Sequence, residues 1–149
     1  MGWDYEVVEG LKAALIDERT TAEFYAALRN MSKTYDGVEA FAEARKDELD
    51  HAREITELLE ELTGMTPVEA TQPVRPPAFQ DYCEGIRKAV AGERKAGIEY
   101  SNIMAISFYK KVNRALEEII SDEEVHLAKF TKLSEILCRD PTGYRDKAY

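Results

Sequence analysis

Two histidines and four glutamates recur at matched spacings along the chain, and together they offer the ligands of a dinuclear metal site. Each histidine follows a glutamate by three residues, which places both side chains on one face of a helix. Another glutamate stands 30 residues before each Glu-x-x-His pair. The six candidate ligands, which are also the candidate catalytic residues, are Glu18, Glu48, His51, Glu93, Glu123 and His126. Carboxylate and imidazole donors without thiolates suit iron or manganese better than structural zinc.

Each of the four glutamates falls in the middle of an apolar stripe whose members recur at steps of three and four residues. This period is typical of amphipathic helices. The clearest stripe is Phe41, Ala44, Glu48, His51, Ile55, Leu58 and Leu62. A buried carboxylate without a compensating charge costs several kcal/mol or takes up a proton. No lysine or arginine falls in the central layers of the stripes, so two divalent cations are the expected compensation.

Chance is a poor explanation of this pattern. With glutamate at its frequency in this chain, the probability of finding all four at these spacings is on the order of a few in ten thousand. The alternative from a different class is a metal-free helical interaction module, in which the same residues form a polar layer of the core. Loss of stability rather than loss of metal in a Glu48→Ala variant would favour that alternative.

The elements that carry these residues are predicted to be four long helices in one all-α domain over residues 1–149. Four of the five prolines lie in the segment 64–77, which we interpret as a linker. It separates one helical hairpin over about 3–63 from a second over about 78–138, and a polar tail follows at 139–149. Spacing places the first turn near residue 34, where Asp36-Gly37 stands, and the second near 109, where Asn113 is the best local candidate for a break.

The two hairpins are similar in sequence, as an alignment of the chain with itself at an offset of 75 residues shows. The pairs that match at this offset are Glu18-Arg19 with Glu93-Arg94, Tyr25 with Tyr100, Asp47-Glu48 with Asp122-Glu123, and His51 with His126. A linker of 14 residues spans at most about 50 Å, and a helix of about 27 residues is about 40 Å long. The linker can therefore run the length of a bundle and make the second and third helices parallel, as in four-helix bundles with one long crossover.

Two further residue pairs are candidates for supporting the ligands. Asp47 and Asp122 precede the two motif glutamates, where a carboxylate can accept a hydrogen bond from the non-ligating nitrogen of a histidine across the bundle. Tyr25 and Tyr100 lie two helical turns after Glu18 and Glu93, where they can bond a ligand carboxylate or act as local redox residues. The alternatives are surface aspartates and tyrosines that only fill the core.

Charge and composition exclude several classes of function. The net charge of −9 offers no cationic surface for nucleic acid, and no apolar run of 18 residues could cross a membrane. The N-terminal residues lack the basic and apolar regions of a signal peptide, so we expect a cytoplasmic protein. Cys83 and Cys138 form no Cys-x-x-Cys pair and are expected to be reduced thiols; a cross-link between them is the alternative if the protein is hyperthermophilic.

These motifs resemble those of the rubrerythrin and bacterioferritin branch of the ferritin-like superfamily. The resemblance covers residues 3 to about 138, and it rests on Glu18, the run Asp47–His51, the pair Gly92-Glu93 and the run Asp122–His126. It implies a ferritin-like four-helix bundle with two iron ions, or manganese or a mixed pair. By the resemblance, Glu48 and Glu123 would bridge the two ions. Glu18 with His51 would complete the coordination of one ion, and Glu93 with His126 would complete that of the other.

The sequence departs from the usual rubrerythrin at two points. The additional glutamate expected three residues after Glu93 is Ala96, which puts ligand exchange at that position in doubt. The absence of a Cys-x-x-Cys pair leaves no rubredoxin-type centre in the chain, so the resemblance is to a short, erythrin-like member. It implies a homodimeric peroxidase that reduces hydrogen peroxide or dioxygen in oxidative-stress defence, with electrons from an external donor protein. A ferritin-type ferroxidase is the alternative, and the sequence leaves the metal, the donor and any hairpin exchange in the dimer open.

Overall fold

The bundle consists of four long helices, as the sequence predicts. The computed structural model describes residues 2–138, with side chains from residue 5 onward, and the predicted tail at 139–149 lies outside the described residues. The helices are α1 (Gly2–Met31), α2 (Tyr35–Thr63), α3 (Tyr82–Ile106) and α4 (Lys110–Leu137), with a short 3-10 helix η1 (Val68–Ala70) in the linker. Within residues 2–138 there is no strand, and no helix is long and apolar enough to span a membrane. The predicted all-α class is therefore confirmed.

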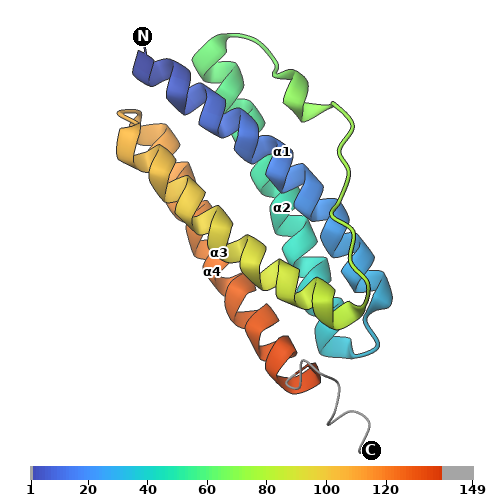
Figure 1. Cartoon of the computed structure of the whole chain (residues 1–149). Coiled ribbons are helices and arrows are strands. Elements are labelled where there is room, and N and C mark those ends of the chain that lie inside the picture. Colours follow the sequence, from blue (N-terminus) through green and yellow to red (C-terminus); the bar gives the residue numbers. More distant parts are fainter. Residues whose placement is uncertain (1, 139–149) are drawn as a thin grey trace, which may run out of the picture.

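The four helices pair as two antiparallel hairpins, α1 with α2 and α3 with α4. The hairpins then pack on each other through α1 against α3 and α2 against α4. After α2 the linker runs back along the bundle, and α3 begins at the end opposite to the one where α2 stops (Figure 1). Helices α2 and α3 are thus parallel, which is the connectivity with one long crossover that the linker length predicts.

Capping residues fix where the helices begin and end. The Thr34 side chain accepts a hydrogen bond from the Gly37 backbone N–H at 3.1 Å, and so it caps the start of α2. Gly64 ends α2 in the left-handed conformation with a φ of 73°. The Asp81 side chain accepts from the Glu84 N–H at 2.9 Å, which starts α3 at Tyr82 rather than near residue 78.

The three residues chosen to mark the hairpin turns lie inside helices instead. The first turn covers 32–34, so Asp36 and Gly37 belong to the first turn of α2. The second covers 107–109, and Asn113 belongs to α4. Its side-chain amide donates to the Ser107 carbonyl at 3.1 Å, so Asn113 secures the turn from within the next helix. In both cases the spacing locates the turn correctly, but the residue chosen to mark it is wrong. The same residue types are favoured in turns and at the starts of helices, so the sequence does not distinguish the two.

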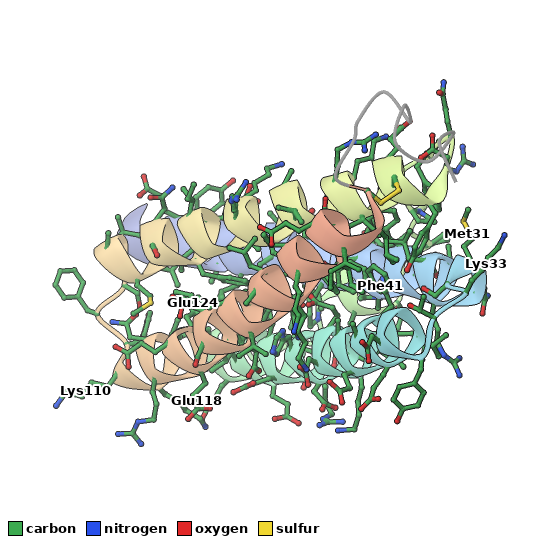
Figure 2. All side chains as sticks on the ribbon, turned by 90° about the horizontal axis from the view of Figure 1, so that it is seen from below. Met31, Lys33, Phe41, Lys110, Glu118 and Glu124 are labelled. Atoms are coloured by element: carbon green, nitrogen blue, oxygen red, sulfur yellow. A yellow bond between two sulfur atoms is a disulfide. The ribbon has the colours of Figure 1, made fainter. Side chains whose placement is uncertain are left out.

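Two apolar clusters fill the bundle interior. The first contains residues such as Leu11, Ile55 and Leu116, while the second includes the aromatic rings of Phe24, Tyr25, Phe41 and Phe130. In the second cluster the rings of Phe41 and Phe130 stack with centroids 4.7 Å apart. Figure 2 shows Phe41 between the helices, whereas Lys110 and Lys33 lie at opposite ends of the bundle. These clusters position the helices so that the polar residues of the stripes face one another.

The two cysteines form a disulfide, so the expectation of reduced thiols is wrong and the cross-linked alternative holds. Cys83 lies at the start of α3 and Cys138 just after α4, with their Cα atoms 5.7 Å apart (Figure 2). This separation is ordinary for a disulfide. The sequence could not reveal it, because the pairing depends on α3 and α4 having matched lengths. The bond closes the second hairpin at its open end.

We predict that a variant with Cys83→Ser and Cys138→Ser is less stable by about 4 kcal/mol. A cross-link between residues 55 positions apart restricts the unfolded chain by roughly that amount in the chain-entropy model. Urea unfolding of the variant and of the wild type, each with and without a thiol reductant, measures the difference. The reductant should destabilise the wild type alone, and equal midpoints in all four samples would contradict the prediction.

Candidate metal centre

All six predicted ligand residues converge in one buried layer, contributed by all four helices. Their side chains are almost wholly inaccessible, with exposures of 1% to 3%. Helix α1 supplies Glu18, α2 supplies Glu48 and His51, α3 supplies Glu93, and α4 supplies Glu123 and His126. Because each glutamate occupies a position of its helix's apolar stripe, burying the stripes brings the carboxylates together.

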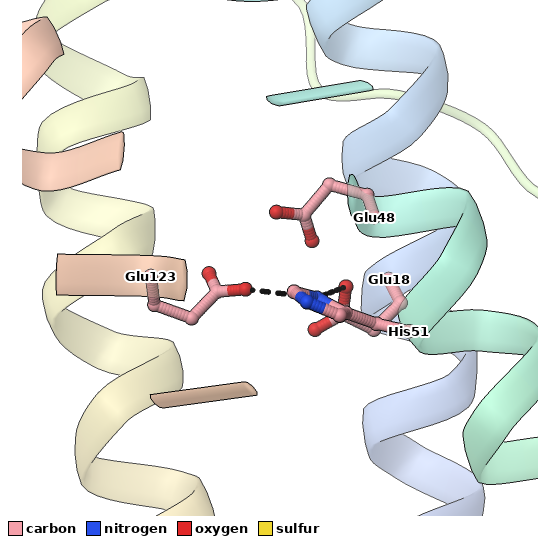
Figure 3. A group of neighbouring side chains, drawn as sticks. All are labelled: Glu18, Glu48, His51 and Glu123. Carbon is pink, nitrogen blue, oxygen red and sulfur yellow. Dashed lines mark hydrogen bonds and ion pairs between the residues drawn. The ribbon is translucent and has the colours of Figure 1, made fainter. Parts of the chain in front are cut away.

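The six residues divide into two overlapping groups whose ligand atoms lie within 4.8 Å of one another. The first group is Glu18, Glu48, His51 and Glu123, whose side chains point toward a common centre in Figure 3. The second is Glu48, Glu93, Glu123 and His126. Glu48 and Glu123 belong to both groups, and they are the pair that the resemblance assigns to bridging. The geometry suits two neighbouring cations that share two carboxylates.

The two histidines turn the same nitrogen toward this centre. His51 Nδ1 lies 3.2 Å from Glu18 Oε2, and also 3.2 Å from Glu123 Oε1. His126 Nδ1 lies 3.2 Å from Glu48 Oε1 and 3.5 Å from Glu93 Oε1. Both Nδ1 atoms are therefore placed to ligate a cation held among the carboxylates.

Aspartates from the opposite hairpin hold the other nitrogen of each ring. The Nε2–H of His51 donates to Asp122 Oδ2 at 2.7 Å, and the Nε2–H of His126 donates to Asp47 Oδ2 at 2.8 Å. A carboxylate in this position fixes the tautomer and the orientation of a ligating imidazole. Both aspartates thus lie where the sequence analysis placed them, in contact with a histidine across the bundle.

The two tyrosines bond ligand carboxylates across the bundle. The Tyr25 hydroxyl donates to Glu93 Oε1, and the Tyr100 hydroxyl donates to Glu18 Oε1. Burial, together with the charge of the bonded glutamate, raises the pKa of both phenols well above the ordinary value. The phenols therefore remain protonated donors and hold one oxygen of each glutamate in place.

Several ligand atoms of the centre have no hydrogen-bond partner among the described residues. The unpartnered buried atoms are Glu48 Oε1, Glu93 Oε2, Glu123 Oε1 and His126 Nδ1. An unsatisfied buried polar atom is expensive, and native proteins rarely keep four in one place. Three carboxylate oxygens and an imidazole nitrogen form a donor set for hard or borderline divalent cations. The residues present therefore fit the metal pair that the sequence predicts.

The protonation of the layer reflects the same crowding of charge. Burial raises the pKa of Glu48 well above its usual range, and the nearby Glu18 raises it further. Burial likewise raises the pKa of Glu123 to about 10. Burial opposes the charging of His51, yet hydrogen bonds with Glu123 and Glu18 raise its pKa to about 11. Without cations, the layer must hold protons to reduce repulsion among its carboxylates.

A cavity of about 360 Å³ between α1 and α3 connects the layer to the surface, and all four glutamates line it. Asp17 and Glu99 stand at its rim, where burial and the neighbouring Glu99 raise the pKa of Asp17. The sequence pattern assigns neither rim residue to the site. Their positions in the sequence could have indicated them, because Asp17 directly precedes Glu18 and Glu99 directly precedes Tyr100.

The crossover between two antiparallel hairpins and the buried layer of glutamates and histidines define a ferritin-like bundle. The family model for rubrerythrin matches residues 9–134. The chain therefore belongs to the rubrerythrin family, as the motifs suggest. No curated protein matches the sequence.

Solved structures agree on the fold. Mycobacterium tuberculosis bacterioferritin BfrA has a TM-score of 0.71 at 23% identity, with 90% of this chain and 87% of that chain covered. Dps from Thermosynechococcus elongatus has a TM-score of 0.59 at 13% identity. The match covers 89% of this chain and 92% of the Dps chain.

A third structure is the two-domain protein of Anabaena variabilis with DJ-1/ThiJ/PfpI-like and ferritin-like domains. Its TM-score is 0.73 at 19% identity, covering 89% of this chain. This chain spans 37% of the length of that two-domain protein. At these identities the likenesses show the fold.

We predict that the metal-free protein loses stability as the pH rises from 6 to 9. Glu123 and His51 have folded-state pKa values of about 10 and about 11, above their unfolded values near 4.5 and 6.5. A group with a raised folded pKa stabilises the native state below its unfolded pKa, and this contribution disappears as the pH rises toward the folded pKa. Urea unfolding at several pH values in the presence of a chelator measures the trend. A Glu123→Gln variant should show a shallower decline, and a stability that increases over this range would contradict the account.

Proposed function

We propose that the protein is a non-haem di-iron oxidoreductase of rubrerythrin type that reduces hydrogen peroxide or dioxygen. The observation that carries the proposal is the pair of overlapping ligand groups sharing Glu48 and Glu123, with unpartnered buried donors in the same layer. Membership of the rubrerythrin family supports it. The proposed setting is oxidative-stress defence in the cytoplasm.

In this proposal Glu18 and His51 hold one ion, Glu93 and His126 hold the other, and Glu48 and Glu123 hold both. Two bound ferrous ions would each supply one electron, which together with two protons convert hydrogen peroxide into two molecules of water. Manganese in one or both positions is compatible with the same donors. The protein's own contribution is to hold these donors in place.

The chain's residues perform the positioning. The Tyr25 and Tyr100 hydroxyls each fix one oxygen of a terminal glutamate, so the second oxygen is left for a cation. The Asp47 and Asp122 carboxylates keep the proton on Nε2 of the histidines and leave Nδ1 free to ligate. The cavity between α1 and α3, about 360 Å³ in volume and lined by all four glutamates, is the path by which peroxide reaches them in this proposal.

Electrons for a second turnover must come from outside the chain in this proposal. The 149 residues contain only the two cysteines that form the disulfide, so they offer no thiolate set for a rubredoxin-type iron centre. We therefore include an external electron-donor protein among the proposed partners, together with a second copy of the chain in a homodimer.

A ferroxidase that oxidises iron for storage would use the same residues and is the second candidate. Storage requires a hollow cage, whereas peroxide reduction does not. A sizing column distinguishes the two candidates, since we expect a small oligomer.

Peroxide added anaerobically to the protein loaded with ferrous iron tests the proposal. We expect an increase in ultraviolet absorbance and the oxidation of two ferrous ions for each peroxide consumed. A Glu48→Ala variant should fail to retain iron while its circular dichroism remains helical, because it lacks a shared ligand. Unchanged absorbance in the iron-loaded wild type would contradict the proposal. A Glu48→Ala variant that unfolds, in a protein whose wild type binds no iron, would favour the metal-free interaction module.

A further inference from the structure

The two halves of the candidate centre arise from the same repeated sequence, but the protein covers them differently. On the first hairpin, η1 packs against both α1 and α2, and Ala70 contacts the apolar cluster beneath it. Arg19 fastens this part of the linker, because its Nη1 donates to the Glu69 carbonyl at 2.8 Å and to the Gln72 carbonyl at 2.6 Å. Arg19 directly follows the ligand Glu18, so the linker is held over that half of the centre.

The hollow that remains beside the linker does not reach the metal ligands. It is about 400 Å³ in volume and lies between α1 and α2, with residues such as Leu15, Ala52 and Ala70 along it. Neither Glu18 nor Glu48 is among the residues that line it. The outer face of the first hairpin therefore offers no opening to its ligands in this hollow.

The corresponding face of the second hairpin carries an open groove between α3 and α4. The groove is about 490 Å³ in volume, and Glu93 and Glu123 form part of its lining, along with Ile98, Ile120 and Leu127. Ile98 is 63% exposed, so the apolar wall of the groove faces solvent. The groove thus leads from the surface to two of the six ligands.

The repeated residues on this face show why the second groove is open. Arg94, the counterpart of Arg19 at the offset of 75, lines the groove and is exposed. Gly97, the counterpart of Ala22, also lines it, and a Cβ added at Gly97 would meet nothing within 4 Å. Ala22 is buried, with an exposure of 2%. The second hairpin thus lacks both the linker cover and the side chain that would narrow the groove.

We propose that the two cation positions differ in access, and that the Glu93–His126 position exchanges its divalent cation with solvent through the groove between α3 and α4. The Glu18–His51 position exchanges more slowly, because Arg19 and the linker cover its face. Both positions share the cavity between α1 and α3, so the groove is an additional path, and it is lined by Glu93, which belongs to the second position alone. This inference rests on the proposed binding of two cations.

Cobalt(II) is a suitable probe, because its visible absorption reports ligation without any turnover. Metal-free protein mixed rapidly with two equivalents of cobalt should gain absorbance in two phases. A His126→Ala variant should lose the fast phase, and a His51→Ala variant should lose the slow one. Release of cobalt to an added chelator should show the same two phases.

Variants away from the ligands test the cause of the difference. Arg19→Ala should accelerate the slow phase by about tenfold, since it removes two hydrogen bonds from a charged donor. Its matched control, Arg94→Ala, should leave the slow phase unchanged. Gly97→Leu should slow the fast phase by a similar factor by filling the groove, while Gly97→Ala should have a small effect. Circular dichroism checks that each variant is folded.

The outcomes separate this inference from the proposed function. Two bound cobalt ions that enter in a single phase would overturn the inference and leave the proposed function intact. An Arg19→Ala variant that is folded and has an unchanged slow phase would also overturn it. If the wild type binds no cobalt, ferrous iron or manganese, the proposed function itself fails, and the inference with it.

Discussion

The structure depends on the need to neutralise four buried carboxylates in one layer of a helical bundle. Glu18, Glu48, Glu93 and Glu123 occupy positions where an apolar side chain would pack more cheaply, and burial raises the pKa of Glu48 and Glu123. Protons can reduce the repulsion, but they leave several ligand atoms without partners. Two divalent cations would satisfy both the charge and the unpartnered atoms.

This layer also joins the two hairpins. Each histidine bonds an aspartate of the other hairpin, and each tyrosine bonds a glutamate of the other hairpin. The supporting bonds therefore cross the interface between the hairpins, while the apolar clusters hold the helices at the required distance. The positions of the ligands and the docking of the hairpins are consequently set by the same contacts, and a change in one alters the other.

The sequence predicts the fold class, and it predicts which glutamates and histidines meet in the buried layer, for a physical reason. A glutamate inside an apolar stripe violates the usual pattern, and four such violations at repeated spacings indicate a shared site. The Cys83–Cys138 bond was mispredicted because the contact between the ends of α3 and α4 is not local in sequence. The turn residues were misassigned because Gly37 and Asn113 serve helix starts instead. The sequence does not predict that the linker covers only one half of the metal centre. Arg19 and Arg94 are the same residue type, and only the contact of Arg19 with the linker distinguishes them.

The central claim is that this layer binds two metal ions, and anomalous diffraction at the iron absorption edge tests it most directly. Crystals of the protein loaded anaerobically with ferrous iron should give two anomalous peaks per chain inside the bundle. The account places one peak among Glu18, Glu48, His51 and Glu123, and the other among Glu48, Glu93, Glu123 and His126. Well-ordered crystals of loaded protein with no peak in this layer, or with iron only at surface carboxylates, would contradict it.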